Sequence, residues 1–474
     1  MRETYELAVI GAGPAGMEAA IAAAQAGVKT VIIDNLPREG GQYYRSLPAP
    51  FSASRKSRVE KEGELLTGQL AGAPATKIYN ALTWGIFKDE KEAGWLVGLY
   101  GSGIPKYLHT LNLVLATGAY DTPVAFPGWT LPGVITCGAA LTLVKSQRVL
   151  PGQRALVTGT GPLLLSSAAH LVEAGMEVAG VCESSRILPK SALYIPILLE
   201  QMGRMQEAAQ YLAVLLCKKV PYRAGWSILE AHGKEHVEEV LIAKVDSMGA
   251  LLVGSQRTER VDTVVCGYGL TPNTGLARMI GCRMEYQPKK GGWVPLRDHT
   301  MLTSLPGVYM AGDGAGIGGA ENARLEGRLA GAAVAVQTEH LNSQAAGEIF
   351  ARIRPDLARQ RRFARLLGEL FPSRPGWISL AREDTLLCRC EEVSLGEVKA
   401  AMADGARTLG EVKMVTRTGM GNCQGRMCEC PVTGAIFQAL AAEGASPESV
   451  GMYSIRPPLH PLPLEFMAEA GLDE

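Results

Sequence analysis

One stretch near the start of the chain, residues 7–34, constrains the fold more than any other. It reads LAVIGAGPAGMEAAIAAAQAGVKTVIID, with a short apolar run, a glycine-rich turn, an Ala-rich segment and a second apolar run. Short continuous apolar runs are typical of strands buried in a parallel sheet, and the segment from about Met17 to Ala26 favours a helix. The order strand, glycine turn, helix and strand predicts a βαβ unit that binds a dinucleotide.

The glycines of this turn have separate physical tasks. Gly11 permits the tight turn, Gly13 lets the backbone approach a pyrophosphate, and Gly16 lets helix and strand pack closely. The N-terminus of the helix supplies free N–H groups and a positive dipole end for the phosphates. Asp34 follows Gly16 by 18 residues, where its carboxylate can accept hydrogen bonds from ribose hydroxyls. A glycine-rich turn without a ligand would leave this order of features unexplained.

A second copy of the pattern begins at Arg154. The segment ALVTGTGPLLLSSAAHLVEAGMEVAGVCE contains a strand, a turn with Gly159 and Gly161, a helix, a second strand and Glu183. It departs from the pattern at Leu164, where Gly or Ala is usual, and a larger side chain there can push the helix away and alter the phosphate site. Two interpretations stay open, namely a nucleotide with Glu183 on its ribose, or a degenerate domain without a ligand.

The composition excludes several classes of function. Lys and Arg total 47, as do Asp and Glu, so the net charge is zero and nothing favours nucleic acid or an anionic membrane as a partner. The apolar start near Leu7 lacks the basic region of a signal peptide, and Glu18 and the glycines interrupt it before it reaches the length of a membrane span. We therefore expect a cytoplasmic protein with no membrane span.

Five of the ten cysteines lie between residues 388 and 430. Without a secretion signal, such a cluster indicates a metal site rather than disulfides. One residue separates Cys388 from Cys390, four separate Cys423 from Cys428, and 32 lie between the two pairs. Zinc usually takes pairs separated by two to four residues, whereas a two-iron cluster spreads four thiolates over two irons and tolerates a tight pair. The spacing favours a [2Fe–2S] cluster.

The surroundings of these cysteines support a cluster without settling every ligand. Glycines at 419, 421 and 425 would leave backbone N–H groups free to bond cluster sulfurs. A structural zinc site or a metal-free vestige is the alternative, and Cys430 could take the place of Cys428. This stretch resembles the bacterioferritin-associated ferredoxin type of [2Fe–2S] module.

Further motifs relate the first unit to a flavoprotein family. GAGPAG (11–16), Asp34, GGQ (40–42), LATG (115–118) and GVYMAGD (307–313) together resemble the glutathione and thioredoxin reductases. The resemblance implies an α/β fold with two Rossmann-like dinucleotide-binding domains, the second inserted in the first, and FAD in the first. It also implies that Asp313 holds the ribityl chain and that a helix beginning near Ala320 points its N-terminus at the flavin, where a positive dipole end stabilises a reduced ring.

The resemblance assigns two sets of binding residues. Those around FAD are Gly11, Ala12, Gly13, Pro14, Ala15, Gly16, Asp34, Asn35, Gly41, Gln42, Ala116, Thr117, Gly118, Gly312, Asp313 and Ala320. Those around a second nucleotide, either NAD or ATP, are Gly159, Thr160, Gly161, Pro162 and Glu183. Thioredoxin reductase carries a CxxC near the place of Cys137, which has no partner here, so the chain lacks the dithiol for disulfide reduction.

Over nearly its full length, with CRCEEV, GMGNCQGRMC and the tail SIRPPLHPLPL, the chain resembles the α subunits of heteromeric amine dehydrogenases. These include opine oxidase, hydrogen cyanide synthase, D-hydroxyproline dehydrogenase and dye-linked L-proline dehydrogenase, with sarcosine oxidase more distant. In that family a β subunit, which is a D-amino-acid-oxidase-like flavoprotein, oxidises the C–N bond. A small ferredoxin-like γ subunit is a further candidate partner. An external acceptor takes the electrons. The complex is expected either to be free in the cytoplasm or to attach to the inner membrane peripherally, through that acceptor.

The first hypothesis is therefore an electron-transferring subunit with FAD and [2Fe–2S], an oxidoreductase whose catalytic residues lie on its partner. The alternatives are a standalone NAD(P)H-dependent FAD reductase that feeds a protein acceptor, and a redox sensor. The sequence contains neither a Ser-His-Asp arrangement nor an HExxH motif, so it gives no sign of hydrolytic chemistry. The expected FAD domain is 1–122 with 272–345, and the second nucleotide domain is 123–271. A linker (346–384), the cluster module (385–445) and a tail (446–474) follow. An amphipathic helical stretch within 189–218 is expected to serve core or dimer packing.

Overall fold

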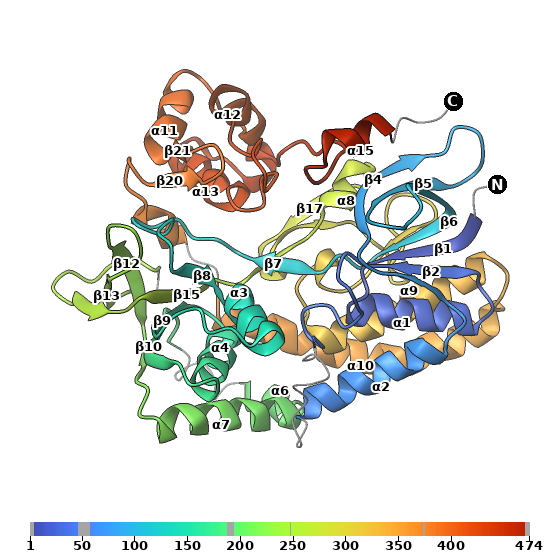
Figure 1. Ribbon diagram of the computed structural model, residues 1–474, viewed down its shortest axis with the longest axis horizontal. Coiled ribbons are helices and arrows are strands. Elements are labelled where there is room, and N and C mark those ends of the chain that lie inside the picture. Colours follow the sequence, from blue (N-terminus) through green and yellow to red (C-terminus); the bar gives the residue numbers. More distant parts are fainter. Residues whose placement is uncertain (1–3, 46–56, 187–193, 247, 373–374, 470–474) are drawn as a thin grey trace. The chain divides into compact units, whose positions relative to one another are not determined.

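The computed structural model describes residues 4–45, 57–186, 194–246, 248–372 and 375–469 (Figure 1). Contacts divide the chain into two compact units, each assembled from segments far apart in the sequence. Unit 1 consists of Met1–Tyr120, Thr271–Ala364 and Ile455–Glu474, and unit 2 of Asp121–Leu270 and Arg365–Ser454.

Unit 1 is built on a seven-stranded sheet in the order β3-β2-β1-β6-β5-β4, with β19 also paired to β6. The strands are β1 (Thr4–Ile10), β2 (Thr30–Ile33), β3 (Thr76–Ile78), β4 (Leu82–Lys88), β5 (Trp95–Tyr100), β6 (Tyr107–Leu115) and β19 (Val308–Met310). β1 runs parallel to β2 and β6, with Ile10 opposite both Ile33 and Leu115. Met310 of β19 also lies opposite Leu115. Four strands therefore end at one edge, and the predicted FAD-binding motifs follow them there.

Two helices cover this sheet side by side, α1 (Pro14–Gln25) and α9 (Ala320–Gln337) (Figure 1). Their backbones approach closely, because a Cβ on Gly327 would lie 2.0 Å from the carbonyl oxygen of Ala15. The predicted helix from about Met17 thus begins three residues earlier, with Pro14 in its first turn, a position that suits proline. Other elements of unit 1 are α2 (Arg58–Gly72), α8 (Gly275–Met279), β17 (Met284–Gln287), β18 (Gly292–Pro295) and α15 (Leu464–Glu469).

Unit 2 contains a five-stranded parallel sheet in the order β11-β10-β9-β15-β8. The strands are β8 (Val134–Thr136), β9 (Arg154–Gly159), β10 (Glu177–Glu183), β11 (Tyr222–Ala224) and β15 (Thr263–Gly267). The helices α3 (Cys137–Leu141) and α4 (Pro162–Glu173) pack against it, and β12 (Trp226–His232), β13 (Glu239–Lys244) and β14 (Arg257–Arg260) form an antiparallel sheet. β7 (Ala119–Asp121) pairs with β16 (Leu270–Pro272), and the division between the two units falls within both strands. The predicted repeat of the βαβ pattern is present.

The cysteine-rich module belongs to unit 2 and shares one hydrophobic core with the second nucleotide domain. It consists of β20 (Leu386–Cys388), β21 (Val393–Ser394), α11 (Leu395–Ala403), α12 (Leu409–Thr416), α13 (Glu429–Ala439) and α14 (Pro447–Val450). Trp129 donates a hydrogen bond from its indole N–H to the Leu386 carbonyl at 2.7 Å, and Tyr268 packs edge-on against Trp377 at 4.8 Å. These contacts make the module a part of the second unit rather than an appended domain.

The structure bears on two expectations about the helical segments. The expected boundary at residue 345 falls inside α10 (Ser343–Leu370), because Ile353 and Leu357 are buried in the core of unit 1. The stretch within 189–218 forms α6 (Ile195–Leu199) and α7 (Met202–Cys217), while its first residues lie outside the described ones. Leu215 is buried in α7, but Leu216 is 73% exposed and Leu199 61%. Core packing therefore accounts for only part of this apolar pattern, and dimer packing, the other expected role, stays a prediction.

Candidate cofactor sites

The first glycine turn is shaped by close backbone contacts at the end of β1. Gly11 donates a hydrogen bond from its N–H to Ile33 at 2.7 Å, and Ala116 donates to Ile10 at 2.8 Å. A Cβ on Gly11 would lie 2.4 Å from the carbonyl oxygen of Ala116, and its φ of +104° suits glycine. A Cβ on Gly16 would lie 1.7 Å from the carbonyl oxygen of Gly11. The turn, the LATG motif and the start of α1 are thus locked together.

The middle glycine of the turn is different, because its open side faces no protein atom at close range. Gly13 is the N-cap of α1 and makes no side-chain cap hydrogen bond. The nearest atom to a Cβ on Gly13 would be Gly41 Cα at 3.8 Å, whereas a Cβ on Gly41 would lie 2.7 Å from Gly13 Cα. The GGQ loop therefore packs on the turn. A helix N-terminus capped only by glycine backbone leaves its N–H groups for an anion, which fits the pyrophosphate of FAD.

Asp34 ties the end of β2 to this turn. Its carboxylate accepts hydrogen bonds from the N–H groups of Ala12 at 2.5 Å and Leu36 at 2.8 Å. Burial raises its pKa, and these two hydrogen bonds oppose that rise. A carboxylate has about four acceptor positions, so two remain for ribose hydroxyls. Asn35 and Gln42, two further predicted contacts, have exposed side chains next to this site.

The later motif returns to the same edge of the sheet. One carboxylate oxygen of Asp313 accepts hydrogen bonds from Gly318 at 2.8 Å and Gly319 at 2.9 Å, which shapes the loop before α9. α9 begins at Ala320 as predicted, again without a side-chain cap. A Cβ on Gly312 would lie 2.9 Å from the Cβ of Ala15. The structure therefore brings Gly312 and Asp313 next to the first turn of α1.

A buried ion network that the sequence analysis missed holds this loop. Glu326 of α9 is 1% exposed and accepts a hydrogen bond from the N–H of Gly312 at 3.0 Å. Arg297 binds it with both terminal nitrogens at 2.8 and 2.9 Å, and Arg361 binds it at 3.1 Å. Burial raises the pKa of Glu326, but the two guanidinium groups more than offset this and hold the pKa below its usual value. The helix also carries Glu321, and no local pattern in the sequence distinguishes Glu326 as the buried one.

The second glycine turn has the same frame but a filled interior. Leu164 is fully buried, and a Cβ on Gly267 would lie 2.9 Å from its side chain and 2.6 Å from the Sγ of Cys137. The large residue that departs from the pattern is thus accommodated because Gly267 has no side chain. A Cβ on Gly159 would lie 1.9 Å from the carbonyl oxygen of Gly267, so this turn is also tight.

Glu183, the predicted ribose ligand of this second site, is fully buried and fully engaged in protein contacts. Its carboxylate accepts hydrogen bonds from the N–H groups of Gly161 at 2.9 Å and Ser185 at 2.8 Å, and the Thr160 hydroxyl binds it as well. Burial raises the pKa of Glu183 to about 7, despite these hydrogen bonds. The Ser185 hydroxyl binds it too, so these four hydrogen bonds hold the carboxyl group in the turn and leave it little to offer a ligand.

The raised pKa of Glu183 predicts a pH dependence of stability. The folded state prefers the protonated acid, so its contribution is fully present below about pH 4.5 and is lost as the pH rises to about 7, by about 3 kcal/mol. Glu183→Gln cannot titrate. The melting temperature of the variant minus that of the wild-type protein should therefore increase as the pH rises from about 4.5 to about 7. Calorimetry of both proteins from pH 4.5 to 8 measures the difference, and parallel curves would contradict the assignment.

The four predicted cysteine ligands form a connected group of thiols. The Cys428 side chain hydrogen-bonds to those of Cys388 and Cys423, and Cys390 hydrogen-bonds to Cys423. Cys388 and Cys428 are buried, Cys423 is half-buried and Cys390 is exposed. Cys430 lies in the first turn of α13. Among the described residues, no three His, Cys, Asp or Glu converge as ligands of a single metal ion. The thiols instead lie in a row of contacting neighbours.

Backbone N–H groups stabilise two of these sulfurs as thiolates. A hydrogen bond from the Cys428 side chain lowers the pKa of Cys388 to about 6, together with hydrogen bonds from the N–H groups of Gly419, Cys390 and Glu391. Cys428 and the N–H groups of Met427 and Gly425 lower the pKa of Cys423 to about 5. Gly419 and Gly425 therefore direct their N–H groups at cysteine sulfurs, while N–H bonding to a bound cluster stays a prediction.

The third glycine has a steric role. A Cβ on Gly421 would lie 2.2 Å from the Cβ of Cys390. Gly421 therefore lets the two cysteine-bearing segments touch. Thiolate-stabilising N–H groups and close packing of these segments fit an iron–sulfur cluster.

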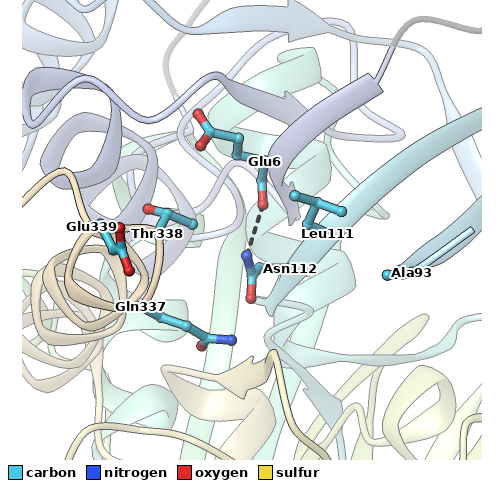
Figure 2. Close-up of a pocket in the computed structure, with 8 residues that line it drawn as sticks. Glu6, Ala93, Leu111, Asn112, Gln337, Thr338 and Glu339 are labelled. Atoms are coloured by element: carbon cyan, nitrogen blue, oxygen red, sulfur yellow. Dashed lines mark hydrogen bonds between the residues drawn. The ribbon is translucent and has the colours of Figure 1, made fainter.

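One surface pocket in unit 1 is separate from these sites. Glu6, Leu111, Asn112 and Gln337 are among the residues that line it, and Asn112 donates a hydrogen bond to the Glu6 carbonyl at 3.0 Å (Figure 2). Glu6 lies near the start of β1, whereas Gly11 follows its end. The pocket is therefore at the opposite edge of the parallel strands from the glycine turn.

None of the helices in the described ranges is both long and apolar enough to span a bilayer.

Two family models match the chain. The model described as pyridine nucleotide-disulphide oxidoreductase matches residues 5–338, and the BFD-like [2Fe-2S] binding domain matches residues 386–436. These matches confirm the predicted α/β fold, FAD and the [2Fe–2S] cluster.

Curated relatives match along almost the whole chain. The A subunit of opine oxidase from Agrobacterium tumefaciens (strain Ach5) is 32% identical over 99% of this chain and 92% of its own length. The HcnB subunit of hydrogen cyanide synthase from Pseudomonas aeruginosa is 31% identical over 98% of each chain. Among solved structures, L-proline dehydrogenase from P. horikoshii matches with a TM-score of 0.69 and 21% identity, over 98% of this chain and 80% of that one. The last match shows the fold alone.

Proposed function

This chain belongs to the pyridine nucleotide-disulphide oxidoreductase family, in the group that includes the A subunit of opine oxidase, and on that premise we propose that it is the electron-transferring subunit of a heteromeric amine or imino-acid dehydrogenase. One observation carries the proposal, namely that this chain combines a match to the pyridine nucleotide-disulphide oxidoreductase family with a BFD-like [2Fe–2S] domain, and is similar over nearly its full length to the named subunits. The relatives' names describe them as subunits, so a partner subunit is part of the proposal.

We propose that the motifs after β1, β2, β6 and β19 hold FAD in unit 1. Gly13 and α1 would bind the pyrophosphate, Asp34 the adenosine ribose and Asp313 the ribityl chain. In unit 2, Cys388, Cys390, Cys423 and Cys428 would ligate the cluster. Cys428 is favoured over Cys430 because it contacts two of the other thiols.

The division of labour follows from the cofactors. FAD can take up two electrons together and release them one at a time, and a [2Fe–2S] cluster accepts one, so together they would let a pair of electrons from an amine leave singly. The C–N bond would be oxidised on a D-amino-acid-oxidase-like β subunit, with a small ferredoxin-like γ subunit as a further candidate. We place the complex in the cytoplasm, with its acceptor free or at the inner membrane.

The proposal is tested by comparing the chain alone with the chain in complex with a co-expressed candidate β subunit. Opines, D-hydroxyproline, L-proline, sarcosine and glycine form the substrate panel. We expect at least one of them to reduce a dye acceptor with the complex and none to do so with the isolated chain. Amine oxidation by the isolated chain would contradict the assignment of the chemistry to a partner.

The second nucleotide site predicts how the chain responds to NADH and NADPH. Glu183 is buried and bound to backbone N–H groups, and Leu164 fills the interior of the turn, so we expect an adenine nucleotide or nothing at this site. Mixing the oxidised chain with either dinucleotide should leave the flavin absorbance unchanged over minutes, while dithionite should bleach it. Rapid bleaching by NADH or NADPH would support a standalone reductase instead.

A further inference from the structure

Tyr453 lies beyond the residues matched by the [2Fe–2S] domain model, yet its side chain reaches the proposed cluster ligands. It is 3% exposed, and its hydroxyl oxygen is 3.7 Å from the Sγ of Cys428, which is fully buried. The ring packs on the cysteine loop, because a Cβ on Gly419 would lie 2.8 Å from it and a Cβ on Gly425 would lie 2.7 Å from it. Tyr453 is therefore part of the wall of the cysteine site.

The direction of the hydrogen bond follows from the chemistry of the sulfur. Between a free thiol and a phenol, either group could donate. A cysteine bound to iron is a thiolate without a proton, so the Tyr453 hydroxyl must then donate and the Cys428 sulfur must accept. Binding of the cluster thus fixes the direction of the hydrogen bond between Tyr453 and Cys428, which the free thiol leaves open.

Neighbouring groups support Tyr453 as a donor. Thr418 is fully buried and hydrogen-bonds to the Tyr453 hydroxyl, and the hydroxyl of Thr416 is 3.2 Å from that of Thr418. A row of three hydroxyls therefore ends at the Cys428 sulfur. The Nζ of Lys413 lies 5.4 Å from the centre of the Tyr453 ring, and a cation over the ring draws electron density from it, which strengthens the O–H group as a donor.

We propose that Tyr453 donates a hydrogen bond to cluster-bound Cys428 and raises the reduction potential of the [2Fe–2S] cluster. Reduction adds one negative charge, part of which resides on the ligand sulfurs, and a donated hydrogen bond stabilises that charge. Tyr453 acts through Cys428 and is a positioning and tuning residue. The inference rests on the proposed function, in which Cys428 is a cluster ligand. It assigns a role at the cofactor to Tyr453, in the segment that follows α14.

The test is redox titration of the full chain, followed by the electron paramagnetic resonance signal of the reduced cluster. Tyr453→Phe keeps the ring on Gly419 and Gly425 and removes only the hydroxyl. We expect the ratio of reduced to oxidised cluster at a fixed ambient potential to fall about tenfold, which is about 59 mV for a one-electron couple. Tyr268→Phe is the matched control, since Tyr268 is equally buried in unit 2 but bonds to Ser227, and it should leave the potential unchanged.

Iron and sulfide analysis separates the two levels of the inference. If Tyr453→Phe retains about two iron and two sulfide per chain but has the wild-type potential, the tuning role is wrong while the cluster assignment stands. If the variant fails to assemble the cluster, Thr418→Val carries the test, because it removes the hydroxyl behind Tyr453 and should lower the potential by a smaller amount. An unchanged potential in Thr418→Val would then overturn the proposal.

Discussion

Gly13→Val should yield a folded, colourless protein. The nearest atom to a Cβ at residue 13 would be Gly41 Cα at 3.8 Å, and the φ of −77° is open to any residue, so the chain itself has room for the change. Replacing glycine at an N-cap by an apolar residue costs about 1 kcal/mol of stability, which a chain of this size should tolerate. The side chain would instead occupy the space where a pyrophosphate meets the backbone. We expect flavin content to fall at least about tenfold.

The neighbouring glycines supply the contrast that makes this result specific. A Cβ on Gly16 would lie 1.7 Å from the Gly11 carbonyl oxygen, so Gly16→Val should lower the melting temperature whether or not FAD is present. A Cβ on Gly68 of α2 would have no atom within 4 Å, so Gly68→Ala should keep both fold and flavin. Absorbance at the flavin band and calorimetry measure the two effects. Normal flavin content in Gly13→Val would show that the pyrophosphate lies elsewhere.

The sequence predicts the first βαβ unit of unit 1 well, because much of it is specified by residues close in the chain. Strand, turn and helix follow one another within 28 residues, and Gly16 contacts Gly11 within the motif, although Gly11 also needs its contact with the distant Ala116. The start of α9 at Ala320 was predicted from the resemblance to the flavoprotein family. Residue-level cofactor contacts remain predictions.

The features that the sequence did not reveal depend on residues far apart in the chain. Glu326 can be buried because Arg297 and Arg361 bind its carboxylate. The two arginines come from other segments, and no local sequence pattern predicts that they lie next to Glu326. The shared core of the second nucleotide domain and the cysteine module is of the same kind, since Trp129 and Leu386 are 257 residues apart. The apolar residues of α7 show a further limit, because helical periodicity shows that a face is apolar but not what covers it.

Cys390→Ala should remove the cluster and leave FAD in place. Cys390 is the exposed member of the thiol group and hydrogen-bonds to Cys423, so its loss removes one of four proposed ligands without opening the core of unit 2. The FAD motifs belong to unit 1, which has its own hydrophobic core. We expect iron and sulfide to fall from about two each per chain to near zero, the signal of the reduced cluster to vanish, and the flavin spectrum to persist.

Cys430→Ala is the matched control for this loss. Cys430 lies two residues after Cys428, in the first turn of α13, and should keep a normal cluster if Cys428 is the fourth ligand. In the assembled complex, Cys390→Ala should slow transfer to external acceptors at least about tenfold while substrate still reduces the flavin of the partner, because the proposed function places the cluster after the flavins in the order of carriers. Full acceptor turnover by Cys390→Ala would refute the relay, and loss of the cluster in Cys430→Ala with its retention in Cys428→Ala would exchange the two ligands.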